Sequence, residues 1–139
     1  MTQAIADYCR RTGQPTPETD AQYIRCIFES LALRYHQVLD MLKSVAPFAI
    51  EKLHVIGGGS QNKLLNQWTA NAIGMPVVAG PSEATAIGNC MMQAKAAGVV
   101  ASRQEMRRII AQSVSLETFE PKDTELWDNA YERFQKMVR

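Results

Sequence analysis

A chain of 139 residues that is 46% hydrophobic and 21% charged has the length and composition of one folded domain in water. We therefore expect residues 1–139 to form a single domain. A net charge of +1 provides no field that would attract nucleic acid or an anionic membrane, so neither is an expected partner.

Membrane insertion and a disulfide-bonded fold are both disfavoured. No apolar run approaches the roughly 20 residues of a membrane-spanning helix, and the N-terminus lacks the pattern of a signal peptide. Cys9, Cys26 and Cys90 are few, odd in number and far apart in the sequence. They indicate a reducing compartment rather than a disulfide framework or a metal site. The expected location is the cytoplasm.

Two helices are predicted in the first third of the chain. The first covers Met1–Thr12 and ends at Gly13, because glycine suits the left-handed conformation of a helix terminus. Thr19 and Gln22 form a capping box that begins the second helix, and Pro47 ends it. The apolar residues of this helix recur at helical spacing and need a covering surface; they are Ile24, Ile27, Phe28, Leu31, Tyr35, Val38, Leu39 and Leu42.

Three strands are predicted further along. Lys52–Ile56 and Met75–Ala79 are short β-type runs, and Leu116–Phe119 is a candidate edge strand. A helical pattern that Gly74 ends separates the first two strands. Its predicted inward residues are Leu64, Leu65, Trp68 and Ala72. This alternation predicts an α/β domain with a small, mostly parallel sheet flanked by helices.

Three more helices are predicted around the third strand. One runs from Glu83 to Ala97, and a second follows a capping box of Ser102 and Glu105. Asp123 is the predicted cap of the last helix. The side chains expected to face inward from that helix are Leu126, Trp127, Ala130, Tyr131 and Phe134.

A turn of three glycines is the most informative segment. The first strand leads directly into Gly57, Gly58 and Gly59, and a helix begins within a few residues. Each glycine costs roughly 1 kcal/mol of backbone entropy in a regular element, which favours either positive φ or close approach of a ligand to bare backbone. The next helix N-terminus adds free N–H groups. Ser60 is a candidate cap for that helix, and Asn62 offers both a donor and an acceptor.

Two familiar glycine motifs do not fit this turn. A Walker A loop requires Gly-Lys-Ser/Thr, whereas Gly59 is followed by Ser-Gln-Asn. The dinucleotide fingerprint G-x-G-x-x-G fits Gly57 and Gly59 but fails at Asn62. A tight β–α turn with a serine cap and no ligand remains open as the alternative to a binding loop.

A second motif spans Gly80–Asn89. Ala84 and Gly88 lie one helical turn apart, with Ala86 nearby, so another helix could approach this face closely. Two interpretations remain open. The helix is buried in its own domain, or it contacts a neighbouring domain that slides or hinges against it.

Together these segments resemble the FGGY family of carbohydrate kinases. Gly57–Asn62, Leu64–Gln67 and Thr69–Ala70 are similar to its adenosine-binding motif. Gly80–Asn89 is similar to the motif that follows, particularly in the branch that acts on L-rhamnulose. Shorter similarities are found at Glu29–Ala32 and Thr118–Pro121. The resemblance covers nearly the whole chain and is strongest from residue 52 to residue 98.

The resemblance implies a two-lobed fold of the actin/Hsp70-like ATPase (ribonuclease H-like) type, of which this chain would be part of the C-terminal lobe. ATP would lie between the lobes, with Asn62 facing adenine and the Glu83–Ala97 helix meeting the other lobe at the hinge. The residues that the resemblance assigns to ATP are Gly57, Gly58, Gly59, Ser60 and Asn62.

In that family the N-terminal lobe supplies the aspartate base, most sugar contacts and the carboxylates that hold Mg²⁺. We therefore expect no catalytic residue and no metal ligand in this chain. The expected function is the ATP-binding lobe of a kinase that phosphorylates a ketose, L-rhamnulose by resemblance, and that is inactive without its N-terminal lobe. The alternative is a non-catalytic module that keeps this fold and binds a protein partner.

Overall fold

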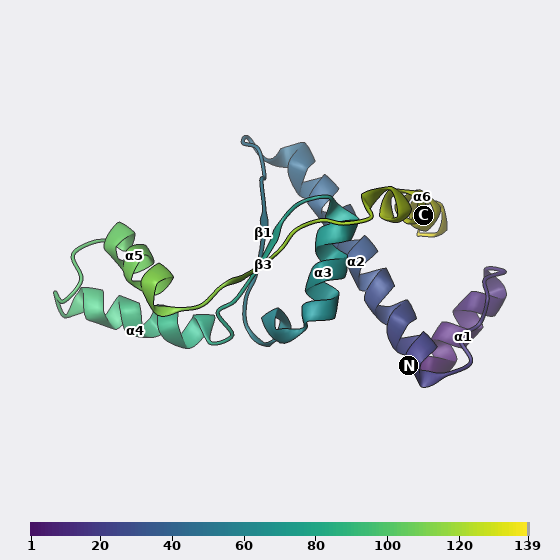
Figure 1. Ribbon diagram of the computed structural model, residues 1–139, viewed down its shortest axis with the longest axis horizontal. Helices are drawn as coiled ribbons and strands as arrows, with labels where there is room; N and C mark the ends of the chain where they lie inside the picture. Colours follow the sequence, from purple (N-terminus) through teal and green to yellow (C-terminus); the bar gives the residue numbers. More distant parts are fainter. Residues whose placement is uncertain (139) are drawn as a thin grey trace.

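The computed structural model describes residues 1–138, and its helices and strands follow the predicted order (Figure 1). They are α1 (Thr2–Arg11), α2 (Asp20–Val45), β1 (Leu53–Val55), a 3₁₀ helix η1 (Gly58–Gln61), α3 (Lys63–Ile73), β2 (Val77–Ala79), α4 (Ala84–Ala96), α5 (Arg103–Ser113), β3 (Glu117–Phe119) and α6 (Thr124–Met137).

Local capping sets several of the helix ends. The Thr19–Gln22 capping box is present at the start of α2, and Gly74 ends α3 in the left-handed conformation with φ of 62°. Ser102 accepts a hydrogen bond from the Glu105 backbone N–H at 3.1 Å. The Glu105 carboxylate accepts from the N–H of Ala101 at 2.9 Å, one residue before the position of a standard capping box.

The three strands form a mixed sheet in the order β1-β2-β3. β1 pairs with β2 in parallel, whereas β3 pairs with β2 in the antiparallel direction, with Val77 opposite Phe119. The prediction of a mostly parallel sheet therefore holds only for the first pair. α4 leads the chain away from the sheet and α5 leads it back to the same end (Figure 1), so β3 must run against β2.

The core lies between one face of this sheet and the helices α2 and α3, which lie on the same side in Figure 1. α6 packs against both helices. Trp68 of α3 and Trp127 of α6 meet with ring centroids 6.1 Å apart, and both tryptophans are half-buried as predicted for core residues. The buried cluster consists of Leu39, Ala70, Ile73, Val77, Ala79 and Phe119.

The apolar stripe of α2 is only partly covered. Leu39 is buried, and Ile27 and Phe28 are half-buried. Five members of the stripe expose between 40% and 52% of their surface to solvent: Ile24, Leu31, Tyr35, Val38 and Leu42. The covering surface that the pattern requires is therefore not supplied by residues 1–138.

Two other helices differ from their predicted inward faces. Leu126, expected to face inward from α6, is 70% exposed, and Leu64 of α3 is 49% exposed. Both residues follow the N-cap of their helix closely, where no neighbouring element covers them. Asp123 occupies the N-cap position of α6, but its side chain makes no capping hydrogen bond.

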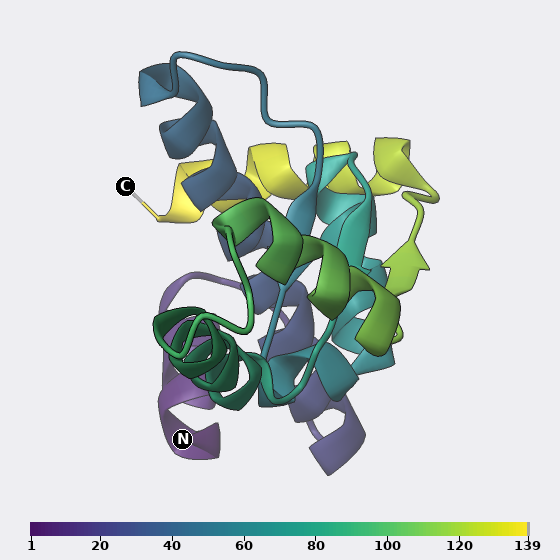
Figure 2. The same ribbon diagram turned by 90° about the vertical axis from the view of Figure 1, so that its left-hand side faces the viewer.

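α4 and α5 project from the other side of the sheet, as both views show (Figures 1 and 2). We call residues 84–113 the α4–α5 arm. No residue of α4 is buried, and the arm buries only Val100 and Met106. Cys90 of α4 is exposed, because this helix face has no neighbour among the described residues.

The helices described here lack the combination of length and apolar character that a bilayer crossing would require.

Candidate nucleotide-binding turn

The first glycine of the turn is required by the backbone itself. Gly57 follows β1 directly and has φ of 74°, in the left-handed region that side chains disfavour. Its N–H donates to the carbonyl oxygen of Pro81 at 3.0 Å. This hydrogen bond joins the turn to the segment after β2.

The other two glycines are not required by the backbone. Gly58 and Gly59 lie in η1 and are exposed, and neither has positive φ. A Cβ atom on Gly58 would meet nothing within 4 Å, and one on Gly59 would meet only Val55 Cγ1 at 3.9 Å, an ordinary contact. The interpretation as a tight turn without a ligand thus explains Gly57 but leaves two open, bare-backbone positions unexplained.

Asn62 takes the helix-capping role that the sequence suggested for Ser60. Asn62 is the N-cap of α3, because its Oδ1 atom accepts from the Leu65 backbone N–H at 3.0 Å. The Ser60 hydroxyl instead donates to the Gly57 carbonyl at 2.7 Å, so the prediction of Ser60 as helix cap is wrong. The hydroxyl closes η1, one turn before α3 begins. With Oδ1 of Asn62 engaged, its Nδ2 group is the donor left for a ligand.

Asn66 supports the turn from beneath and was not singled out from the sequence. It is 2% exposed, and its Nδ2 group donates to the Ser60 carbonyl at 2.9 Å. Its backbone N–H donates to the Asn62 carbonyl at 3.0 Å. The sequence signal was present: Asn66, Thr69, Ala70 and Ile73 follow helical spacing and are all buried.

The two glycine motifs lie next to each other. The N–H of Gly80 donates to the Val55 carbonyl at 2.9 Å, immediately before Gly57. Gly80 has φ of 108°, and an added Cβ would lie 3.3 Å from the Ser115 carbonyl oxygen. The Gly80–Pro81 peptide bond is cis. α4 begins three residues later, so the arm starts beside the turn.

Few charged groups surround the turn. Lys63, the first residue of α3, forms an ion pair with Glu117 of β3 at 2.9 Å. In the described part of the chain, no three His, Cys, Asp or Glu side chains are grouped so that they could hold a metal ion. What the turn offers a ligand is therefore bare backbone and the Asn62 amide.

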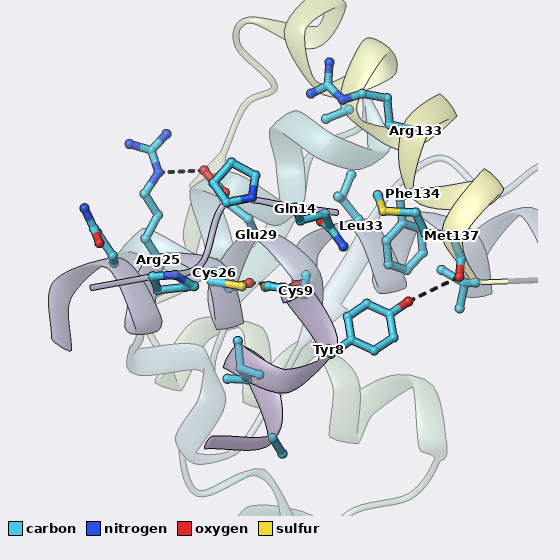
Figure 3. Close-up of a pocket in the computed structure, with 18 of the residues that line it drawn as sticks. Tyr8, Cys9, Gln14, Arg25, Cys26, Glu29, Leu33, Arg133, Phe134 and Met137 are labelled. Atoms are coloured by element: carbon cyan, nitrogen blue, oxygen red, sulfur yellow. Dashed lines mark hydrogen bonds and ion pairs between the residues drawn. The ribbon is translucent and has the colours of Figure 1, made fainter. Parts of the chain in front are cut away.

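A cavity of about 610 Å³ lies away from this turn, between α1, α2 and α6 (Figure 3). None of the predicted site residues lines it. Cys9 and Cys26, far apart in sequence, lie side by side in it. Burial, and next the neighbouring Cys9, raise the pKa of the Cys26 thiol.

The fold is that of a sugar kinase lobe. The structure is similar to part of a xylulose kinase from Rhodospirillum rubrum, with a TM-score of 0.66 and 19% sequence identity. The similarity covers 90% of this chain and 25% of the other. At this identity the match defines the architecture only, and it agrees with the predicted C-terminal lobe of an actin/Hsp70-like ATPase.

Residues 1–97 match the C-terminal domain of the FGGY family of carbohydrate kinases. The chain belongs to this family. It is 60% identical over all 139 residues to a rhamnulokinase of Bacteroides thetaiotaomicron, of which it covers 29%. It is 43% identical over 137 residues to a rhamnulokinase of Pectobacterium carotovorum, of which it covers 28%. The chain thus spans less than a third of the length of these relatives.

Proposed function

We propose that this chain is the ATP-binding lobe of a carbohydrate kinase that transfers the γ-phosphoryl group of ATP to a ketose, L-rhamnulose. The class of enzyme follows from the family. The choice of sugar rests on the 60% and 43% identical rhamnulokinases. All 139 residues would act as one domain within that larger enzyme.

The observation that supports this proposal most strongly is the open backbone at Gly58 and Gly59. Neither glycine is needed for the conformation of the turn, and a side chain at Gly58 would point into free space. A nucleoside pressed against bare backbone is a direct reason to keep both positions without a side chain. Gly57 and Ser60 would shape this surface, and the Nδ2 group of Asn62 would donate to the adenine edge.

The chemistry of phosphoryl transfer would come from the rest of the enzyme. Bound Mg²⁺ neutralises charge on the transferring phosphoryl group in such reactions. Its ligands, the aspartate base and most of the sugar contacts would be supplied by the N-terminal lobe. This chain would hold ATP and complete the closed cleft.

The α4–α5 arm would contact that lobe. Ala84 and Gly88 are half-buried and Ala86 is exposed, and a Cβ on Gly88 would meet nothing within 4 Å. These are the surroundings expected for a helix that packs against another lobe, and not for one buried in its own domain. The arm begins three residues after Pro81, whose carbonyl binds the glycine turn, so lobe closure and nucleotide binding would involve adjoining segments.

A chimera tests the proposal. Residues 1–139 would replace the matching segment of the Bacteroides thetaiotaomicron rhamnulokinase, which is 60% identical over this whole length. We expect ATP-dependent phosphorylation of L-rhamnulose by this chimeric kinase and none by the isolated chain, measured in a coupled assay for ADP. The unmodified relative and a heat-denatured chimera are the controls.

Two results would contradict the proposal in different ways. A folded chimera that does not bind an adenine nucleotide in calorimetry would favour the non-catalytic, partner-binding module. A chimera that consumes ATP with another ketose but not with L-rhamnulose would keep the kinase and reject the sugar.

A further inference from the structure

We infer that Asn66 is a positioning residue, which holds the exposed face of the glycine turn in the orientation that binds ATP. The inference rests on the proposed function. Asn66 would not touch the nucleotide, because it is buried beneath the turn with 2% of its surface exposed. It would act through Ser60, to whose carbonyl oxygen its Nδ2 group donates at 2.9 Å.

A short series of hydrogen bonds connects Asn66 to the open glycines. The Ser60 hydroxyl and backbone N–H both donate to the Gly57 carbonyl, at 2.7 and 3.0 Å. The Gly57 N–H donates to the Pro81 carbonyl at 3.0 Å. Gly58 and Gly59 lie between Gly57 and Ser60, so both ends of the exposed segment are fixed, and the Gly59 carbonyl also accepts from the Asn62 N–H at 3.2 Å.

The turn needs such support because η1 is a single turn of 3₁₀ helix with two adjacent glycines. Glycine has the largest backbone freedom of any residue, and short 3₁₀ segments have poor hydrogen-bond geometry. A loop that must be ordered when the ligand arrives binds more weakly than one already ordered. The Asn66 side chain supplies an anchor from α3, the helix that packs most extensively on α2.

Asn71 provides a matched comparison on the same helix. It too is a buried asparagine, with 7% of its surface exposed, but its contacts lead away from the turn. Its Oδ1 atom accepts from Gln67 Nε2 at 2.7 Å and from the Lys122 backbone N–H at 3.0 Å. Asn71 therefore anchors the segment after β3, and its loss should affect stability alone.

The test compares Asn66→Ala with Asn71→Ala in the chimeric kinase. Each removes a buried hydrogen-bonding amide, so both should lower the melting temperature. Only Asn66→Ala should raise the KM for ATP and the Kd for ADP, each about tenfold, the effect of losing one hydrogen bond that holds the binding surface. The KM for L-rhamnulose should stay within twofold. Steady-state kinetics and calorimetry with ADP supply the two independent readouts.

Asn66→Asp supplies a second variant in case Asn66→Ala does not fold. An ionised carboxylate cannot donate to the Ser60 carbonyl, but a protonated carboxyl can, and burial raises the pKa of the introduced group. We expect the KM for ATP to be raised at pH 8 and to fall towards the wild-type value at pH 6.

The outcomes separate this inference from the proposed function. If the wild-type chimera does not bind ADP, the proposed function fails. If it binds ADP and Asn66→Ala or Asn66→Asp binds equally well across this pH range, the positioning role of Asn66 is overturned. Equal losses of ADP affinity in Asn66→Ala and Asn71→Ala would also overturn it, because they would indicate general destabilisation.

Discussion

The sheet with α2, α3 and α6 differs from the α4–α5 arm in how its apolar residues are used. In the first region Ile73, Val77 and Phe119 are buried in one cluster, and buried amides join α3 to the loops around it. In the arm, Val100 and Met106 are the buried residues, while Met92 is 59% exposed. The first region, which we call the closed region, encloses a buried core although the stripe of α2 stays partly exposed; the arm has small and apolar residues that no other element of residues 1–138 covers.

The two regions differ in the same way in the residues that form their surfaces. Ala84 and Gly88 lie one turn apart on one face of α4, and a Cβ on Gly88 would meet nothing within 4 Å. Small residues permit close approach by a partner. The stripe of α2 is also partly exposed, and the relatives are more than three times as long as this chain. The glycine turn lies where the closed region meets the arm.

The largest expected effect separates the stabilities of the two regions. Ile73→Ala removes a core side chain that is 5% exposed, and should lower the free energy of unfolding by about 2–5 kcal/mol. Met92→Ala, in the arm, should change it by less than about 0.5 kcal/mol. Chemical denaturation of the isolated chain, followed by circular dichroism, measures both. Similar losses in the two variants would mean that the arm is part of the same folded unit.

The next prediction concerns the activity of the chimeric kinase, and it compares substitutions at Gly88 and Gly80. Gly88→Leu adds a side chain to an open position, so the melting temperature of the isolated chain should be nearly unchanged. At a lobe interface the same side chain should lower kcat of the chimeric kinase about tenfold, the scale of an overpacked contact.

Gly80→Leu is the matched control, since φ of 108° and the Ser115 carbonyl at 3.3 Å leave no room for a side chain. It should lower the melting temperature of the isolated chain by several degrees, on the order expected for strain of about 1–3 kcal/mol. A comparable thermal loss in Gly88→Leu would reject the interface interpretation of α4.

The smallest expected effect is a pH dependence confined to the closed region. His36 of α2 stacks on Tyr131 of α6 with ring centroids 3.7 Å apart. Burial lowers the pKa of His36, and the nearby Asp40 and Asp128 oppose this only in part. Because the pKa of His36 is lower in the folded state than in the unfolded state, the unfolded protein takes up the proton first as pH falls. The free energy of unfolding is therefore highest above the unfolded pKa of about 6.5, and it decreases as pH falls from there towards the folded pKa.

Denaturation at pH 7.5 and pH 5.5 measures this effect. We expect a small fall in the midpoint for the wild type and a smaller one for His36→Gln, which cannot take up the proton. If the denaturation midpoint falls by the same amount in both proteins, His36 makes no contribution to the pH dependence.

The sequence was sufficient for features that depend on local chemistry. The Thr19–Gln22 box and the end of α3 at Gly74 are set by a few adjacent residues, and both were predicted. The capping of α3 by Asn62 and not by Ser60 was not predicted, because both residues are good N-caps, and η1 displaces the start of α3 by one turn. The role of Asn66 was missed because the helical pattern was taken from apolar residues alone, which gives no signal for a buried asparagine.

Features that depend on distant segments could not be predicted in the same way. The antiparallel direction of β3 follows from how α4 and α5 return the chain, which no residue of β3 specifies. Cys90 has the character of a buried residue, but nothing among residues 1–138 covers it. The proximity of Cys9 to Cys26 needed the packing of α1 on α2. The candidate site residues Gly57, Gly58, Gly59, Ser60 and Asn62 form one continuous turn, and their contact with ATP stays a prediction.

Gly58→Val in the chimeric kinase tests the central claim, that this turn binds ATP through bare backbone, most directly. Because a Cβ at Gly58 meets nothing within 4 Å, the variant should fold with a nearly unchanged melting temperature. Its branched side chain should nevertheless displace the nucleotide and raise the KM for ATP about tenfold or more, with the KM for L-rhamnulose unchanged. A folded Gly58→Val enzyme with the wild-type KM for ATP would contradict the claim and leave the glycines as a structural turn.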